Sequence, residues 1–302
     1  MHLSDLHLTR TDGRPRSEPD LLSPLKGMNQ TFRRLLATQQ LQNADLILVT
    51  GDITDRGDTA SWQVFNEATT RAGVADRLLL VPGNHDVCCL GTRLPGRRNA
   101  YRTDDLRRAT RGLSMGMAES SQMLEGGWPV TRFPIVAHPD PRVVVFGLNS
   151  NFLGNLNIAS NALGKVDYFQ LVALAGKMHR FRNVPVKIVA LHHSPNIPYT
   201  ATARRRGTRP LTALARAGHQ IPRGQRRAIR LLCITHRVRL LLHGHLHQAD
   251  DRRISGLRIV GAPASTQPVQ RRADGADVQI FTYTVSAQAN RVRTRLTTIT
   301  LN

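Results

Sequence analysis

The sequence predicts an α/β fold, because short apolar runs that end in Gly, Asp, Asn or His alternate with stretches of helical spacing. Four runs have the composition of strands that carry polar residues at their carboxyl ends: residues 45–50, 77–81, 185–191 and 238–242. Strands alternating with helices are typical of an α/β core.

Three stretches show the apolar spacing of amphipathic helices. The first lies before the run at 45–50, the second before the run at 77–81, and the third covers residues 225–236. Their apolar faces are Leu25, Met28, Phe32, Leu35 and Leu36; Trp62, Phe65 and Ala68; and Ile229, Leu232 and Cys233.

After Asp251 the sequence becomes rich in β-branched residues that alternate with polar ones. This pattern predicts antiparallel strands at 257–260, 279–285 and 291–300 that close the fold. Residues 88–142 are charged, punctuated by Gly and weakly periodic, which predicts a partly helical insertion. We therefore expect residues 1–302 to form a single domain with an insertion at about 88–142 and C-terminal strands at about 256–300.

The composition is strongly basic, with 42 Lys and Arg against 21 acidic residues and a formal charge of +21. Such a surface attracts nucleic acid, an acidic membrane face or a phosphorylated substrate, unless the charge is only a general bias toward Arg. The marked cluster is Arg204 to Arg206, with Arg209 nearby.

Three cysteines, two of them adjacent at Cys88 and Cys89, do not form a disulfide framework, which favours a reducing compartment. No apolar run approaches the roughly 20 residues of a transmembrane helix. The start, Met-His-Leu-Ser-Asp, lacks the features of a signal peptide. We expect a soluble cytoplasmic protein without a transmembrane segment. The few residues before Asp5 predict either a short first strand or a true start further upstream.

Histidines concentrate at or beside the predicted strand ends. Together with carboxylates, imidazoles suit Zn, Mn or Fe, and the absence of Cys at these positions disfavours a structural zinc site. Seven of the twelve histidines have this placement: His7, His85, His192, His193, His243, His245 and His247.

Three motifs place a glycine at a strand end, which lets the next side chain turn into a crevice. They are Gly51-Asp52-Ile-Thr-Asp55, Gly83-Asn84-His85-Asp86 and Gly244-His245-Leu-His247. Asp5-Leu-His7 is a weak signal alone, but the four motifs in this order at strand ends indicate a common site.

These motifs, with a strand-end histidine before the last of them, resemble the ordered signature of calcineurin-like metallophosphoesterases. The resemblance covers residues 3 to about 247. It implies a four-layer αββα sandwich, in which two mixed β-sheets are flanked by helices, with two metal ions at the strand ends.

The resemblance also implies roles for individual residues. Asp5, His7 and His247 would hold one metal ion, Asn84, His192 and His245 the other, and Asp52 would bridge them. His85 would approach the substrate without being a required ligand, so His85, Asp52 and Asn84 form the expected catalytic group. His192 is chosen over His193 because family members with a double His before Pro resemble His192-His193-Ser-Pro195 in that register.

Two metal ions roughly 3.5 to 4 Å apart can lower the pKa of a shared water and clamp a phosphoryl group, so a metal-bridging hydroxide is the expected nucleophile. His85 would stabilise charge on the phosphoryl group or leaving oxygen. Asp55 and Asp86 would either orient neighbouring groups or cap the following turn.

The sequences of the motifs favour hydrolysis of a phosphodiester of the cyclic-nucleotide type. The expected substrate is a small phosphorylated molecule, and the expected cofactors are two ions of Mn, Fe or Zn. Cleavage of a pyrophosphate in a nucleotide-linked lipid precursor is an alternative. The net charge and the Arg204 to Arg206 cluster motivate a nuclease, although His192-His193-Ser-Pro195 differs from the His-Gln motif of that branch. A non-catalytic scaffold would not need so many spaced ligand-type residues.

Overall fold

In the computed structural model, two six-stranded β-sheets form the core of the part of the chain that the structure describes. The structure describes residues 1–16, 26–87, 133–151, 162–195, 219, 221–271, 275–286 and 291–301.

The first sheet has the strand order β10-β11-β1-β2-β3, with β12 paired to the outer side of β11. Strands β1, β2 and β3 are parallel, whereas β11 is antiparallel to β1, β10 and β12. The bounds are β1 (His2–Leu3), β2 (Ile47–Val49), β3 (Leu78–Leu80), β10 (Gln270–Arg271), β11 (Ala276–Ser286) and β12 (Arg291–Leu301).

The second sheet has the order β4-β5-β6-β7-β9-β8. Its four central strands are parallel, and the edge strands β4 and β8 are antiparallel to their neighbours. The bounds are β4 (Ile135–Asp140), β5 (Val143–Gly147), β6 (Val186–Ala190), β7 (Leu240–His243), β8 (Asp250–Ile254) and β9 (Leu257–Gly261).

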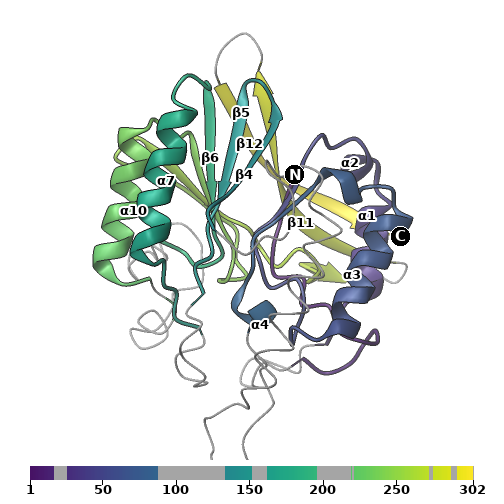
Figure 1. Cartoon of the computed structure of the whole chain (residues 1–302). Coiled ribbons are helices and arrows are strands. Elements are labelled where there is room, and N and C mark those ends of the chain that lie inside the picture. Colours follow the sequence, from purple (N-terminus) through teal and green to yellow (C-terminus); the bar gives the residue numbers. More distant parts are fainter. Residues whose placement is uncertain are drawn as a thin grey trace, which may run out of the picture.

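Helices cover the outer faces of both sheets. Figure 1 shows α7 and α10 on one side of the molecule and α1 and α3 on the other, with the sheets between them. This is the expected four-layer αββα sandwich. The helices are α1 (Asn29–Leu36), α2 (Gln39–Gln42), α3 (Thr59–Arg71), the 3-10 turn η2 (Ala75–Arg77), α4 (Asn84–Val87), α7 (Tyr168–Arg180) and α10 (Arg223–Thr235).

Strands of the second sheet are buried on both faces, and this explains their nearly continuous apolar sequence. In β6, Ile188 packs into the core that includes the first sheet, while its neighbour Val189 packs beneath α7 and α10. In β7, Leu240 and Leu241 divide in the same way between the two cores. This alternation fixes which side chains of β6 and β7 face the first sheet and which face the helices.

The predicted strand runs and helices agree with the observed elements. The strand expected at 257–260 is β9, which is antiparallel to β8, as predicted, but parallel to its other neighbour, β7. The edge strand β8 itself was not predicted. A tight turn at Ser255 and Gly256, both with positive φ, reverses the chain between β8 and β9.

Much of the expected insertion lies outside the described residues. Residues 88–132 are in that group, whereas residues 135–140 form β4 and pair with β5. Cys88, Cys89 and the cluster Arg204 to Arg206 with Arg209 also lie outside the description.

Within the described ranges, no helix combines the length and apolar character needed to cross a membrane.

Candidate metal centre

The segments that follow the strand ends are joined by backbone hydrogen bonds. The Asp5 N–H donates to the Gly51 carbonyl at 3.0 Å, and the His7 N–H donates to the Asp52 carbonyl at 2.8 Å. In the second sheet, the Gly244 N–H donates to the His192 carbonyl at 3.0 Å. The His85 N–H donates to Asp52, and the His245 N–H donates to Asp5 across the two sheets, so all four motifs predicted from the sequence meet at one end of the sandwich.

Backbone conformation marks the same residues. Seven non-glycine residues of the described chain have positive φ, a conformation that costs an L-residue on the order of 1 kcal/mol. Such strain concentrates where a side chain must be aimed at a functional site. Five of the seven are predicted ligands: Asp5 (53°), His7 (45°), Asp52 (50°), His245 (72°) and His247 (53°).

One cluster of potential ligand atoms comprises Asp5, His7, Asp52 and His247. The Nε2 atoms of His7 and His247 are 3.1 Å apart, and His247 Nε2 lies 3.4 Å from Asp5 Oδ1. His7 Nε2 also lies 3.7 Å from Asp52 Oδ2. Two imidazole nitrogens this close to each other and to two carboxylates form a donor set that a metal ion would accept.

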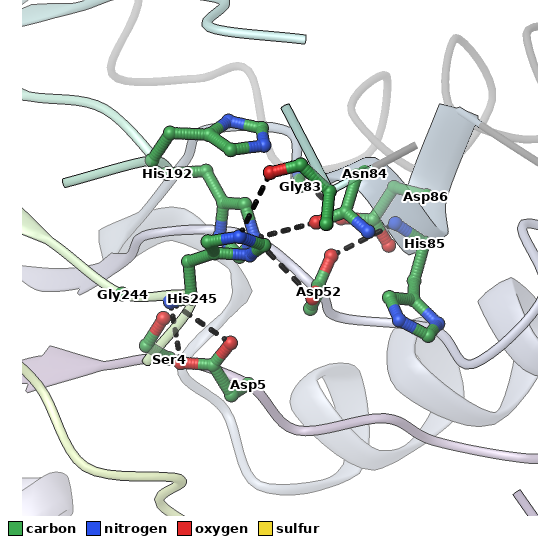
Figure 2. A network of polar contacts seen from close by, with 12 residues as sticks. Ser4, Asp5, Asp52, Gly83, Asn84, His85, Asp86, His192, Gly244 and His245 are labelled. Carbon is green, nitrogen blue, oxygen red and sulfur yellow. Dashed lines mark hydrogen bonds and ion pairs between the residues drawn. The ribbon is translucent and has the colours of Figure 1, made fainter. Parts of the chain in front are cut away.

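A second cluster comprises Asp52, His192 and His245. His192 Nε2 lies 3.2 Å from Asp52 Oδ2, 3.2 Å from His245 Nδ1 and 3.0 Å from Asn84 Oδ1. Figure 2 shows Asp52 between the His85 segment and the imidazoles of His192 and His245. Asp52 belongs to both clusters, so the two sets share one carboxylate.

Hydrogen bonds to backbone carbonyls fix the tautomers of two imidazoles in the second cluster. A carbonyl only accepts, so His192 donates its Nδ1–H to Thr50 at 2.7 Å and presents Nε2 to the cluster. His245 donates its Nε2–H to Ala162 at 3.1 Å and presents Nδ1. The two rings thus use different nitrogens but direct them to the same place.

Asp52 and the neighbouring imidazoles shift one another's pKa values. Burial opposes ionisation of Asp52, but the imidazoles of His192 and His85 outweigh this and hold the pKa of Asp52 well below its usual range. Burial likewise disfavours the charged form of His192, yet the nearby Asp52 carboxylate raises the pKa of His192 to about 9. The metal-free chain therefore keeps a proton at His192, among three acceptor atoms.

The imidazoles of His7 and His245 are neutral by contrast. Burial is the main cause that lowers the pKa of both well below its usual range, helped by Arg16 for His7 and by His193 for His245. Neutral imidazole is the form that binds metal.

Two glycines allow the motifs to approach one another. A Cβ atom on Gly83 would collide with the backbone N and the carboxylate of Asp52, and one on Gly244 would collide with the Ser4 hydroxyl. Figure 2 shows both glycines beside these residues. The small residue before each ligand is thus required by packing against the neighbouring loop.

His85 lies at the edge of the centre. Its backbone N–H donates to Asp52 Oδ1 at 2.9 Å, and its ring Nδ1–H donates to the Asp55 carbonyl at 2.9 Å. The ring packs edge-on against His7 with 4.5 Å between centroids. A carboxylate oxygen of Asp55 lies 3.9 Å from His7 Nδ1, and potential ligand atoms of Asp55, His7 and His85 lie close together.

The remaining strand-end histidines lie outside the two clusters. His193 is fully buried and its Nδ1 lies 2.9 Å from the Ser150 hydroxyl, while its ring is 4.5 Å from that of His245. His243 is also buried, with Nε2 3.3 Å from the Ser194 hydroxyl. His219, which the sequence analysis did not single out, places its ring centroid 4.9 Å from that of His245. As a lone histidine outside any motif, it gave no signal.

The fold and the two clusters with a shared carboxylate indicate a protein with a candidate dinuclear metal centre. The family model for calcineurin-like phosphoesterases matches residues 1–249. The chain belongs to this family, which implies a hydrolase of phosphoric esters, and its His and Asp clusters indicate a dinuclear metal centre.

A solved structure supports the fold. A dimetal phosphatase from Danio rerio is 11% identical, with 100% of this chain and 98% of that chain covered and a TM-score of 0.57. A purple acid phosphatase from yellow lupin is 12% identical over 99% of this chain, with a TM-score of 0.48, and this chain spans only 53% of its length. A search of curated protein sequences gave no match.

Proposed function

We propose that this protein is a dinuclear metal-dependent phosphodiesterase. In this proposal Asp5, His7 and His247 hold one metal ion, and Asn84, His192 and His245 hold the other. Asp52 bridges the two ions. The nitrogen and oxygen donors suit Mn, Fe or Zn.

The observation that carries the proposal is the position of Asp52 in both clusters. Its Oδ2 atom lies 3.7 Å from His7 Nε2 and 3.2 Å from His192 Nε2, one imidazole from each set. It is almost completely buried, with an exposed fraction of 2%. A buried carboxylate between two imidazole sets is the arrangement expected of a bridging ligand, and a structural ion pair would need only one of these imidazoles.

When bound, the two metal ions would supply Lewis acidity for hydrolysis of a phosphoester at neutral pH. The chain itself would orient the groups around the phosphoryl oxygen. Asn84 offers an amide oxygen beside His192, and the hydrogen bond from Nδ1–H to the Asp55 carbonyl fixes the orientation of the His85 ring. When its imidazole is protonated, His85 carries a second proton on Nε2, with which it would stabilise charge on the phosphoryl group or which it would pass to the leaving oxygen.

For the substrate we propose a phosphodiester of the cyclic-nucleotide type. Support comes from the amino-acid sequences of three motifs, which are Ser4-Asp5-Leu-His7, the segment from Gly51 to Gly57, and the segment from Gly83 to Val87. Because these motifs form the metal centre itself, they bear on the reaction more directly than on the substrate.

A screen of purified protein loaded separately with Mn, Fe, Zn or Mg would test this proposal. The substrates are bis(p-nitrophenyl) phosphate, p-nitrophenyl phosphate, cyclic AMP, a nucleotide-linked lipid pyrophosphate and single-stranded DNA. We expect turnover of the diester and of cyclic AMP to exceed turnover of the monoester. Preference for the pyrophosphate or for DNA would replace the substrate assignment, and no turnover with any metal would favour a non-catalytic scaffold.

A further inference from the structure

A cavity of about 610 Å³ lies at the end of the sandwich opposite the metal centre. Its volume falls within the range of small-molecule sites. Six arginines contribute to its lining: Arg237, Arg239, Arg253, Arg258, Arg291 and Arg293.

The cavity is separated from the metal centre by the length of β7. Arg237 and Arg239 precede the amino end of this strand, whereas His245 and His247 follow its carboxyl end. At about 3.3 Å per residue, the path from Arg239 to Gly244 is roughly 17 Å. This exceeds the Debye length of about 10 Å at 0.1 M salt, so the arginines do not act on the metal centre by charge alone.

The arginines come from three segments that are distant in sequence. Arg237 and Arg239 lie between α10 and β7, Arg253 and Arg258 lie on the β8–β9 hairpin, and Arg291 and Arg293 begin β12. Strand β12 is the edge of the first sheet and β8 is the edge of the second, so the cavity forms where the two sheet edges end.

Only one of the six guanidinium groups has an acidic partner among the described residues. Arg258 forms a bidentate pair with Asp251, with distances of 2.8 and 2.6 Å. The other five are without an ion pair in that part of the chain. All five are exposed at the mouth of the cavity, so their guanidinium groups are open to a bound anion and are not neutralised by a carboxylate of the described chain. Burial is the main cause that lowers the pKa of Lys187, and the charges of Arg239 and Arg237 lower it further.

Protection of a sheet edge explains only part of this arrangement. Charged residues on an edge strand hinder pairing with another chain, and this accounts for Arg291 and Arg293 on β12. It does not account for Arg237 and Arg239, which lie before a central strand. Edge protection therefore does not explain why arginines of all three segments line one cavity, whereas binding of an anionic ligand would explain it.

The lining also limits the kind of ligand. The described residues that line the cavity include no aromatic ring for stacking a base and no acidic or amide side chain for binding its edge, and the nearby Asp251 carboxylate is already paired with Arg258. Guanidinium groups match phosphate oxygens in geometry and charge. We propose that this arginine cavity binds a short chain of linked phosphate groups, as a second anion site separate from the metal centre.

Calorimetric titration of the full chain with tripolyphosphate, with and without bound metal, tests this proposal. We expect binding in both states, tighter than for monophosphate because several guanidinium groups engage at once. Arg253→Gln/Arg293→Gln should weaken the binding at least ten-fold, and Arg237→Gln/Arg239→Gln from another segment should do the same. Hydrolysis of bis(p-nitrophenyl) phosphate should not change in either variant.

Arg33→Gln/Arg71→Gln is the matched control, because it removes the same charge from exposed positions on α1 and α3. Equal weakening in this control would show that net charge alone binds the anion and would overturn the proposal. Absence of tripolyphosphate binding to the wild-type chain would overturn it too. Binding of duplex DNA through the cavity arginines, without binding of tripolyphosphate, would replace the proposed ligand with a nucleic-acid backbone.

Discussion

Asp86 accepts two hydrogen bonds from Thr54, one from its backbone N–H at 2.8 Å and one from its hydroxyl at 2.9 Å. The other carboxylate oxygen of Asp86 accepts from the N–H groups of Gly83 at 2.9 Å and Ile53 at 3.2 Å. Asp86 thereby ties the loop that carries Asp52 to the loop that carries Asn84. Of the two roles considered for Asp86 from the sequence, these contacts favour the orientation of backbone at the site.

Replacing Asp86 should destabilise the protein and loosen the centre. In Asp86→Asn, one side of the amide would be an NH2 group that faces two buried donors, and a buried donor without an acceptor costs about 1–3 kcal/mol. We expect the free energy of unfolding of the metal-free chain to fall by about 2 kcal/mol or more, measured by chemical denaturation.

Asp76→Asn provides the control, because the Asp76 side chain is 62% exposed. Its effect should stay within about 0.5 kcal/mol. Equal stability of the Asp86 and Asp76 variants would show that the hydrogen bonds to Asp86 do not hold the two loops together.

Metal stoichiometry tests the bridging role of Asp52. Elemental analysis of the metal-loaded wild-type chain should give close to two ions, whereas Asp52→Ala should bind one or fewer, because both ligand sets lose a carboxylate oxygen. Saturation of the wild-type chain at one ion, with the same value in Asp52→Ala, would contradict a bridged site.

The fold was predictable where the sequence alone carries the signal. Runs such as Leu240 to Leu242 are apolar because β7 is buried on both faces. The motif that follows the run indicates where the strand ends. Helix α7 was missed although Asp167 caps its first turn by accepting from the Gln170 N–H at 2.8 Å. Edge strand β8 was missed because its sequence, Asp-Asp-Arg-Arg-Ile, is mostly charged.

For the site, order along the chain predicted which residues meet, but not how they are aimed. Asp52 and His192 are far apart in sequence, and their 3.2 Å approach depends on the two sheets packing together. The choice of ring nitrogen depends on carbonyl partners such as Thr50 and Ala162, which belong to no motif. Tertiary contacts of this kind leave no periodic trace in the sequence.

Metal loading should displace a proton from His192. The pKa of His192 is raised to about 9 in the metal-free chain, so at pH 7 its imidazole is protonated and the incoming ion must compete with that proton. Affinity for the second ion should therefore increase with pH and level off above about pH 9. Calorimetry in two buffers of different ionisation enthalpy should show about one proton released per chain at pH 7, in addition to any proton from metal-bound water. Metal binding with no proton release between pH 6 and 8 would refute this account of His192.

His85 should matter for turnover and not for metal content. Its backbone N–H holds Asp52 and would do so in His85→Ala as well, while the imidazole would be lost. We expect kcat for the diester to fall by about 10² to 10⁴, the usual contribution of an acid or base, with two ions still bound. Loss of metal in parallel with activity would identify His85 as a ligand instead.

The adjacent histidines His192 and His193 should respond differently to substitution. His192 presents Nε2 to Asp52, His245 and Asn84, so His192→Ala should weaken binding of the second ion and abolish turnover. His193 contacts Ser150 through both its backbone N–H and its ring, so His193→Ala should retain both ions and mainly alter substrate handling, with some loss of stability from the cavity it leaves. Metal content, kcat and KM should be measured on variants whose melting curves show that they are folded. Loss of metal from His193→Ala with retention in His192→Ala would move the ligand assignment by one residue.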